Sequence, residues 1–184
     1  MPTWVWVLIG IGAAIVCALI AWNVYRNRRR ARLQERFGSE YDRALADAPT
    51  RREAESELAE RRKRREELDI RPLEQANRDR YMSRWRQTQE KFVDNPEAAV
   101  FDADVLIQEV MRERGYPVED FDQRAADLSV DHADVISNYR AAHAIAVSNQ
   151  QGNATTDDLR NAVVHYRALF SDLLEVDTAK LQQT

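Results

Sequence analysis

The sequence predicts an all-α protein made of an N-terminal transmembrane helix, a charged helical connector and a compact C-terminal bundle of about five helices. Three observations lead to this prediction. The stretch from Trp4 to Trp22 is apolar and uncharged, the next residues are rich in arginine, and the remainder places apolar residues at helical spacing without strand-like alternation. We expect an anchor at residues 1–25, a connector at 26–72, the bundle at 73–176 and a tail at 177–184.

The predicted membrane span has the length that a bilayer requires. Its nineteen residues, rising about 1.5 Å each, form a helix of roughly 28 Å, close to a hydrocarbon core of about 30 Å. Tryptophan rings favour the headgroup region, and tryptophans stand at both borders of the span. The residues to which we assign a role in the span are Trp4, Trp6, Gly10, Ala14, Ala18 and Trp22.

A cluster of basic residues follows the span. Residues 26–36 contain six arginines and one glutamate, whereas no charged side chain precedes the span. Positive charge favours the cytoplasmic side, so we expect a single-pass cell-membrane protein with its N-terminus outside and its C-terminal domain in the cytoplasm. The juxtamembrane basic residues are Arg26, Arg28, Arg29, Arg30 and Arg32.

A cleaved signal peptide is the alternative to an anchor. The segment lacks a basic start and an A-x-A-like cleavage pattern before the arginines, which favours the anchor. Cleavage would instead produce an exported domain.

Charge is distributed unevenly along the chain. Residues 1–80 carry a net charge of +4 and residues 81–184 a net charge of −8. Anionic lipid attracts the basic half, while nucleic acid repels the acidic half, so we expect a bilayer contact and no nucleic-acid partner. The only cysteine, Cys17, lies in the span, so no intramolecular disulfide can form.

Small residues in the span allow weak self-association. Gly10, Ala14 and Ala18 share one face, which permits close approach of two helices. The face formed by Ala13, Cys17 and Ala21 is nearly as small. We therefore expect at most a weak homodimer without a unique register.

The sequence of the connector predicts that it contains two polar helical segments. The first covers residues 31–49, with an interruption at Gly38 and an end near Pro49. The second begins with a capping box of Thr50 and Glu53 and is supported by acid-before-base pairs at i, i+4. These pairs are Glu57 with Arg61 and Glu60 with Arg64.

The second connector helix has almost no apolar face. Its one seam contains two arginines and is too polar for a coiled coil. We expect a solvated, partly frayed spacer helix that ends before an extended stretch at residues 70–72. The seam consists of Ala54, Leu58, Arg61, Arg65 and Leu68.

Five stretches of helical periodicity predict the bundle. The second helix starts after Asn95, with Pro96 at its first position, and stops at Gly115. Val100, Ala103, Ile107, Val110 and Met111 form its apolar stripe, and Phe101 and Leu106 flank it. The first helix carries the stripe Tyr81, Trp85, Thr88 and Phe92, and the last carries Leu159, Val163, Tyr166, Phe170 and Leu173.

The remaining helices of the bundle have cap signals as well. A short third helix covers residues 118–128, and Ser129 or Asp131 caps the fourth. Thr155 and Asp158 form a second capping box at the last helix. We expect Trp85 and Phe170, at the centres of their stripes, to be buried against other helices.

No catalytic constellation is evident, and we expect neither an enzyme nor a bound cofactor. His143 lies on the apolar stripe of the fourth helix of the bundle and His165 flanks the stripe of the last, so they are the best candidates for a haem or metal site between these two helices. No C-x-x-C-H or Glu-x-x-His motif accompanies them, so we interpret both as partly buried, hydrogen-bonded histidines. His132 is interpreted as part of a helix start, and the acidic pairs as helix caps.

The stretch RYMSRWRQTQEKFVDNPEAAVFDADVLIQEVMRERGYPVEDFDQRAADLSVDH, with NYRAAHAIA and LRNAVVHYRALFSDLL, resembles a family of uncharacterised bacterial single-pass membrane proteins. Some members are described only as membrane or secreted proteins. The resemblance implies the same layout of anchor, arginine-rich connector and helical domain, and no known activity. We expect an interaction or adaptor protein with an unknown protein partner; a membrane-tethered or exported domain that binds haem, a metal or another small ligand is the alternative.

Overall fold

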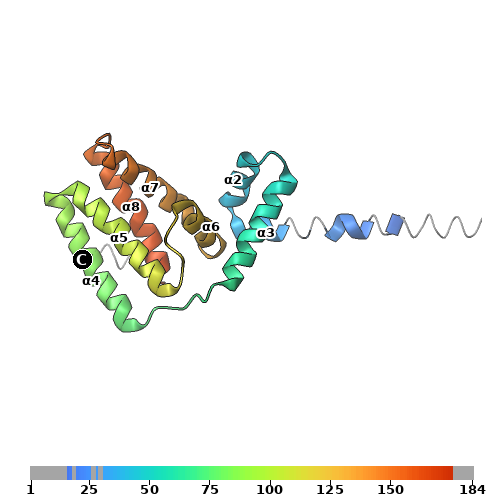
Figure 1. The fold of residues 1–184 in the computed structure, drawn as a ribbon, viewed down its shortest axis with the longest axis horizontal. Helices are drawn as coiled ribbons and strands as arrows, with labels where there is room; N and C mark the ends of the chain where they lie inside the picture. Colours follow the sequence, from blue (N-terminus) through green and yellow to red (C-terminus); the bar gives the residue numbers. More distant parts are fainter. Residues whose placement is uncertain (1–15, 18–19, 26–27, 29–30, 176–184) are drawn as a thin grey trace, which may run out of the picture.

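The computed structural model describes residues 16–17, 20–25, 28 and 31–175 (Figure 1). Every secondary-structure element with defined bounds in these residues is an α-helix, which confirms the all-α class. The predicted tail lies outside the described residues, and so do Trp4, Trp6, Gly10, Ala14 and Ala18 of the predicted span. Within the described part of the chain, no helix combines the length and the apolar character that crossing a membrane requires.

Five helices of the described chain form the C-terminal bundle, as predicted. Helix α5 packs against both α4 and α8, and α8 packs against α7, so that residues 75–114 and 136–173 enclose one core (Figure 1). The short helix α6 lies at the end of α7 that faces the N-terminal part. The bounds are α4 (Gln75–Asp94), α5 (Pro96–Arg114), α6 (Phe121–Asp131), α7 (Ile136–Gln150) and α8 (Thr156–Leu173).

The core of the bundle consists of the predicted stripes. Trp85 and Phe170 are completely buried, which confirms the expectation for both. Leu106, predicted to flank the stripe of its helix, is buried as well, whereas Phe101 is 61% exposed. Other large side chains that are completely buried in this core include Ile107, Met111, Leu128, Ile136, Tyr139, Tyr166, Leu169 and Leu174.

Local capping signals place several helix ends where the sequence predicted them. The Asn95 side chain accepts a hydrogen bond from the backbone N–H of Ala98 at 3.0 Å, and α5 then starts with proline. Gly115 ends α5 in the left-handed conformation, with φ of 97°. Both halves of the capping box of Thr155 and Asp158 are present at the start of α8.

The start of α7 differs from the prediction. Ser129 and Asp131 both belong to α6, and α7 begins only at Ile136, without a side-chain cap. The Ser129 hydroxyl instead donates to the Ala126 carbonyl, 2.7 Å away in the preceding turn. Helix α6 continues through this stretch because Val130 is buried against the N-terminal part of the chain. His132 consequently caps the C-terminal end of α6 and does not belong to a helix start.

Residues 31–67, which we call the N-terminal hairpin, form a unit of their own. Residues 31–37 are helical and turn at Gly38 into α2 (Ser39–Asp47), and α3 (Arg51–Glu67) runs back along them. Gly38 has a positive φ of 48°. The cluster of buried side chains inside the hairpin consists of Leu33, Phe37, Tyr41, Ala44, Ala54 and Leu58, together with Val130 from α6.

The expectation of a solvated spacer helix is wrong. Helix α3 packs against α2 on one side and α6 on the other, and Ala54 and Leu58 are completely buried. The predicted seam is thus real, but it faces this protein's own helices. Its arginines can join a buried contact because their aliphatic stems pack while their guanidinium groups find carboxylates.

The predicted ion pairs of α3 are partly confirmed. Arg61 pairs with Glu57 along the helix, whereas Arg64 reaches Asp127 of α6, with 3.6 Å between the charged atoms. Thr50 caps the helix by accepting a hydrogen bond from the backbone N–H of Glu53. Residues 68–74 then connect the hairpin to α4 without helical structure, as expected for residues 70–72.

Candidate functional site

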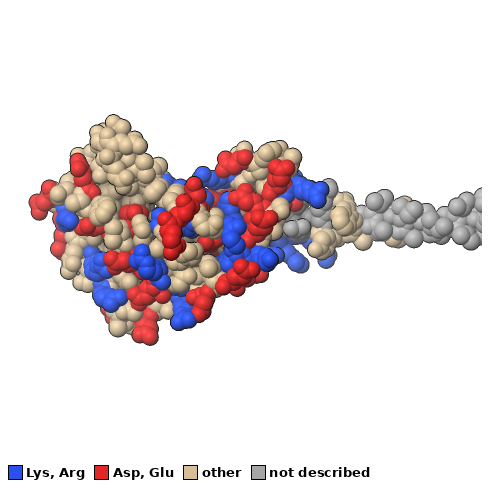
Figure 2. Space-filling view, in the orientation of Figure 1, with Lys and Arg blue, Asp and Glu red and all other residues tan. Residues whose placement is uncertain are grey.

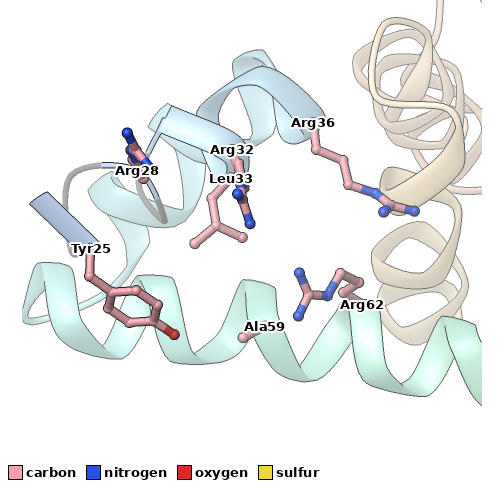
Figure 3. Close-up of a pocket in the computed structure, with 7 residues that line it drawn as sticks. All are labelled: Tyr25, Arg28, Arg32, Leu33, Arg36, Ala59 and Arg62. Carbon is pink, nitrogen blue, oxygen red and sulfur yellow. The ribbon is translucent and has the colours of Figure 1, made fainter.

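A basic pocket lies on the N-terminal hairpin and is the candidate functional site (Figure 3). It has a volume of about 410 Å³ and opens between Tyr25, Arg28 and the helical residues 31–36 on one side and helix α3 on the other. Arg32 and Leu33 point from this segment toward α3, and Ala59 and Arg62 extend from α3 toward them. The residues that line the pocket are Tyr25, Arg28, Arg32, Leu33, Arg36, Ala59 and Arg62.

The charge of the basic pocket is not neutralised by its own walls. Four of its seven lining residues are arginines, and none is acidic. A second hollow, between the hairpin and the bundle, also contains four arginines, but Asp47, Glu57, Asp120 and Asp122 line it as well. Figure 2 shows the same mixture of blue and red over most of the visible bundle surface. Of these two hollows, the basic pocket is the one that favours an external anion.

The four arginines of the basic pocket differ in their partners. Arg36 lies 3.7 Å from an Asp131 oxygen and donates to the Val130 carbonyl at 3.4 Å. Arg62 lies 3.5 Å from Glu66, in a pair whose side chains are both about half exposed. Among the described residues, no carboxylate pairs with Arg28 or Arg32. These two guanidinium groups can thus bind a ligand without giving up an ion pair.

Aspartate residues of α6 hold the hairpin against the bundle. Asp131 accepts from Arg65 of α3 and, at 3.0 Å, from the hydroxyl of Tyr116. Asp127, which is almost completely buried, receives Arg64 of the same helix. These contacts hold α3 against α6. Because α3 forms one wall of the basic pocket, they also position that wall.

Glu40 joins three helices at the centre of this contact. Its side chain is 3% exposed and accepts from Arg140 of α7 at 3.0 Å and from Arg61 of α3 at 3.4 Å. One buried carboxylate thus holds two guanidinium groups that come from opposite sides of the hairpin–bundle contact. Removing the Glu40 carboxylate would leave Arg140 desolvated without this partner and Arg61 with Glu57 alone.

His132 belongs to a chain of polar groups behind the hairpin. Its Nε2 lies 3.3 Å from the hydroxyl of Tyr116, and its Nδ1 bonds with the Asp172 carboxylate of α8. Burial raises the pKa of Tyr116, and the negative charge of Asp131 acts in the same direction. The phenol therefore stays protonated at neutral pH, and the chain of groups connects α6 to α8.

The structure gives His143 and His165 separate partners. His143 stacks on Phe121 of α6, with 3.6 Å between ring centroids and 10° between ring planes. The expected hydrogen bond of His143 is wrong for its Nδ1, which is buried without a hydrogen-bond partner. His165 contacts the side-chain amide oxygen of Asn138 through its Nδ1, at 2.9 Å, and not a backbone or carboxylate group. Neither contact brings in a second metal-ligating side chain, and within the described part of the chain no three His, Cys, Asp or Glu residues gather as a metal site would require.

The predicted juxtamembrane residues fall partly within the described chain. Arg28 and Arg32 line the basic pocket, while Arg26, Arg29 and Arg30 lie outside the described residues. Trp22, at the border of the predicted span, is exposed.

Sequence reasoning missed several of the charged residues that shape this site. They are Glu40, Arg36, Arg62 and Arg140. Arg62 belongs to the run RRKRR, which is typical of a solvated helix face. The spacing of three residues between Ala59 and Arg62 nevertheless places both on one side of α3. Glu40 and Arg140 are 100 residues apart in the chain. No local pattern could have paired them.

No family model, no curated protein and no solved structure matches this chain. The resemblance to bacterial membrane proteins therefore remains a prediction, and the function has to be inferred from the chain's own residues and geometry.

Proposed function

We propose that this chain is a single-pass membrane protein, anchored in the cell membrane by residues 4–22, and that its helical domain acts as an interaction or adaptor module at the cytoplasmic surface. The observation that carries the proposal is the basic pocket. Tyr25, its first residue, follows Trp22 of the predicted span by three positions. A cluster of four arginines so close to a span, two of them without a carboxylate partner among the described residues, belongs beside anionic lipid headgroups.

Electrostatics supports this placement. Each basic side chain near an anionic membrane surface contributes about 1 kcal/mol of attraction. The acidic part of the chain, residues 81–184, is repelled by the same surface. A domain tethered in this way turns its hairpin to the bilayer and its bundle to the aqueous phase.

The buried charged groups support an interaction role more than a catalytic one. Glu40 joins α2 to α3 and α7, Asp127 receives α3, and His132 joins the end of α6 to α8. Each of these groups stabilises the position of one helix on another. A rigid domain held at a fixed place on the membrane is suited to presenting a surface to a protein partner.

Reporter fusions to the full-length chain test the proposed anchor. A phosphatase fused after Thr184 should be inactive, and a fluorescent protein in the same place should be bright, because the C-terminus is on the cytoplasmic side. The chain should also remain in the membrane fraction after alkaline carbonate extraction. An active phosphatase, or a mature chain that begins near Ala21, would overturn the proposal.

A further inference from the structure

We propose that the basic pocket binds a phosphate group, carried either by the headgroup of an anionic lipid or by a small soluble compound. The inference deepens the proposed function, since the lipid is within reach only if residues 4–22 anchor the chain. The phosphate chemistry itself depends on the side chains that the structure places around the pocket (Figure 3).

The basic pocket differs in its charge from two other hollows of the described chain. In the hollow between hairpin and bundle, four carboxylates balance four arginines. The hollow beside Arg84 and Lys91 includes Asp102, which pairs with Lys91 at 2.6 Å. The basic pocket has no acidic lining residue. Arg28 and Arg32 have no carboxylate partner among the described residues, and an anion bound in the pocket would supply one.

Arginine in particular favours a phosphate ligand. The planar guanidinium fork presents paired N–H donors whose spacing matches two oxygens of a phosphate, and it stays charged at any physiological pH. Arg32 and Arg62 approach the pocket from its two opposite walls, so they can contact different oxygens of one phosphate (Figure 3). A phosphate offers enough oxygens for several arginines, whereas a carboxylate offers only two.

The remaining walls accommodate the group to which the phosphate is attached. Leu33 and Ala59 provide apolar surface, and Tyr25 adds an aromatic ring with a hydroxyl. The volume of about 410 Å³ lies within the range of small-molecule pockets and exceeds what a single phosphate fills. The pocket therefore fits an esterified phosphate with a polar or glycerol-like neighbour.

Part of the pocket is preorganised by the fold. The contacts of Arg36 with Val130 and Asp131 direct its guanidinium toward α6 and attach this end of the pocket to the bundle (Figure 3). Arg62 stands on α3, whose position is held by buried Ala54 and Leu58. Binding thus orders the side chains of Arg28 and Arg32 more than it orders helices, which reduces the entropic cost.

The test measures phosphate binding to the full-length protein in neutral detergent micelles by isothermal titration calorimetry. The probes are dioctanoyl phosphatidic acid, inorganic phosphate and, as a zwitterionic reference, dioctanoyl phosphatidylcholine. The pocket variant combines Arg32→Gln with Arg62→Gln. The matched control combines Arg51→Gln with Arg52→Gln, which removes the same charge from two exposed residues at the start of α3, outside the pocket.

We expect phosphatidic acid to bind the parent at least tenfold more tightly than phosphatidylcholine does. The pocket variant should lose at least tenfold in affinity, and the control should stay within twofold of the parent. Equal losses in both variants, or equal affinity for the two lipids, would overturn the proposal. A melting temperature of the pocket variant close to that of the parent verifies that its hairpin is folded.

The probes also separate the two sources of phosphate. Inorganic phosphate that binds as tightly as phosphatidic acid, with the same sensitivity to the pocket variant, identifies a soluble ligand. Binding of the lipid alone identifies a headgroup site. Failure of the membrane anchor would appear in the reporter fusions and would leave phosphate binding in micelles unchanged, so the two proposals fail in distinguishable ways.

Discussion

The indole ring of Trp85 stacks on the phenyl ring of Phe170, with 4.7 Å between ring centroids and 18° between ring planes. Both side chains are completely buried, and they join α4, the first helix of the bundle, to α8, its last. The stack therefore closes the bundle by connecting residues that are far apart in the chain. Aromatic pairs of this kind contribute about 0.5–1.5 kcal/mol beyond the burial of their surface.

Truncating either ring should destabilise the bundle strongly. We expect Trp85→Ala and Phe170→Ala each to lower the free energy of unfolding by about 3–5 kcal/mol, because each leaves a large cavity. Urea unfolding of the full-length chain, followed by circular dichroism, measures this. Phe101→Ala removes a ring that is 61% exposed and should change stability by less than about 0.5 kcal/mol. Equal effects of all three substitutions would contradict the stacked core.

A substitution at Gly115 should be costly for two reasons. Its φ of 97° is left-handed, which costs a residue with a Cβ about 1–2 kcal/mol. A Cβ there would also lie 2.4 Å from the backbone oxygen of Asp69, and that backbone is held nearby by the 2.9 Å bond from Arg71 N–H to the Arg114 carbonyl. Gly115→Ala should therefore destabilise the protein more than Gly152→Ala does.

Gly152 is the matched control, because its φ of 74° is also positive but a Cβ there would meet nothing within 4 Å. Thermal melts of the two variants compare the effects. If both variants lose the same stability, the close approach of residue 69 does not constrain Gly115.

Removing the charge of Glu40 should release the hairpin from the bundle. Glu40→Gln leaves Arg61 and Arg140 mostly buried without their common carboxylate, and breaking a buried pair in this way costs about 3–5 kcal/mol. Amide hydrogen exchange should accelerate in α2 and α3 and stay unchanged in α4 and α5. Glu35→Gln, at an exposed position of the same hairpin, should leave exchange unchanged. Uniform acceleration along the whole chain would show that hairpin and bundle unfold together.

His143 should make the bundle less stable in mild acid. Burial lowers its pKa below the ordinary value of about 6.5, Arg124 acts in the same direction, and Asp104 and Asp122 oppose the change. Between the lowered pKa of His143 in the folded protein and its ordinary pKa in the unfolded chain, the folded protein binds fewer protons than the unfolded chain. The contribution of His143 to stability is therefore greatest above pH 6.5 and decreases as the pH falls through the folded-state pKa.

Urea midpoints at pH 7.5 and pH 5.5 measure this effect. His143→Leu keeps an apolar contact with Phe121 and should reduce the loss of stability between the two pH values. An unchanged pH dependence in this variant would mean that the imidazole is solvated in the folded protein.

The helical class and most helix ends of the bundle were predictable because their signals are local. The spacing of Tyr81, Trp85 and Thr88 follows the helical repeat and marks the buried face of α4. Asn95 and Thr155 accept hydrogen bonds from residues three positions ahead, so their role depends on neighbours in the sequence alone. The start of α7 could not be predicted in this way, since Ser129 and Asp131 both resemble caps and only the burial of Val130 extends α6 past them.

The sequence alone determined that the chain is helical, that the apolar stripes of the bundle face inward, and that arginines gather after an apolar stretch, because each of these depends on residues within a few turns. The tertiary structure decided that α3 is buried against α2 and α6 and that the basic pocket exists. A seam of Ala54, Leu58, Arg61 and Arg65 is apolar enough to be buried only when Glu40 and Asp131 supply carboxylates from other helices. Those carboxylates are distant in the chain, and the free energy of burying an arginine depends on whether folding brings its partner to it.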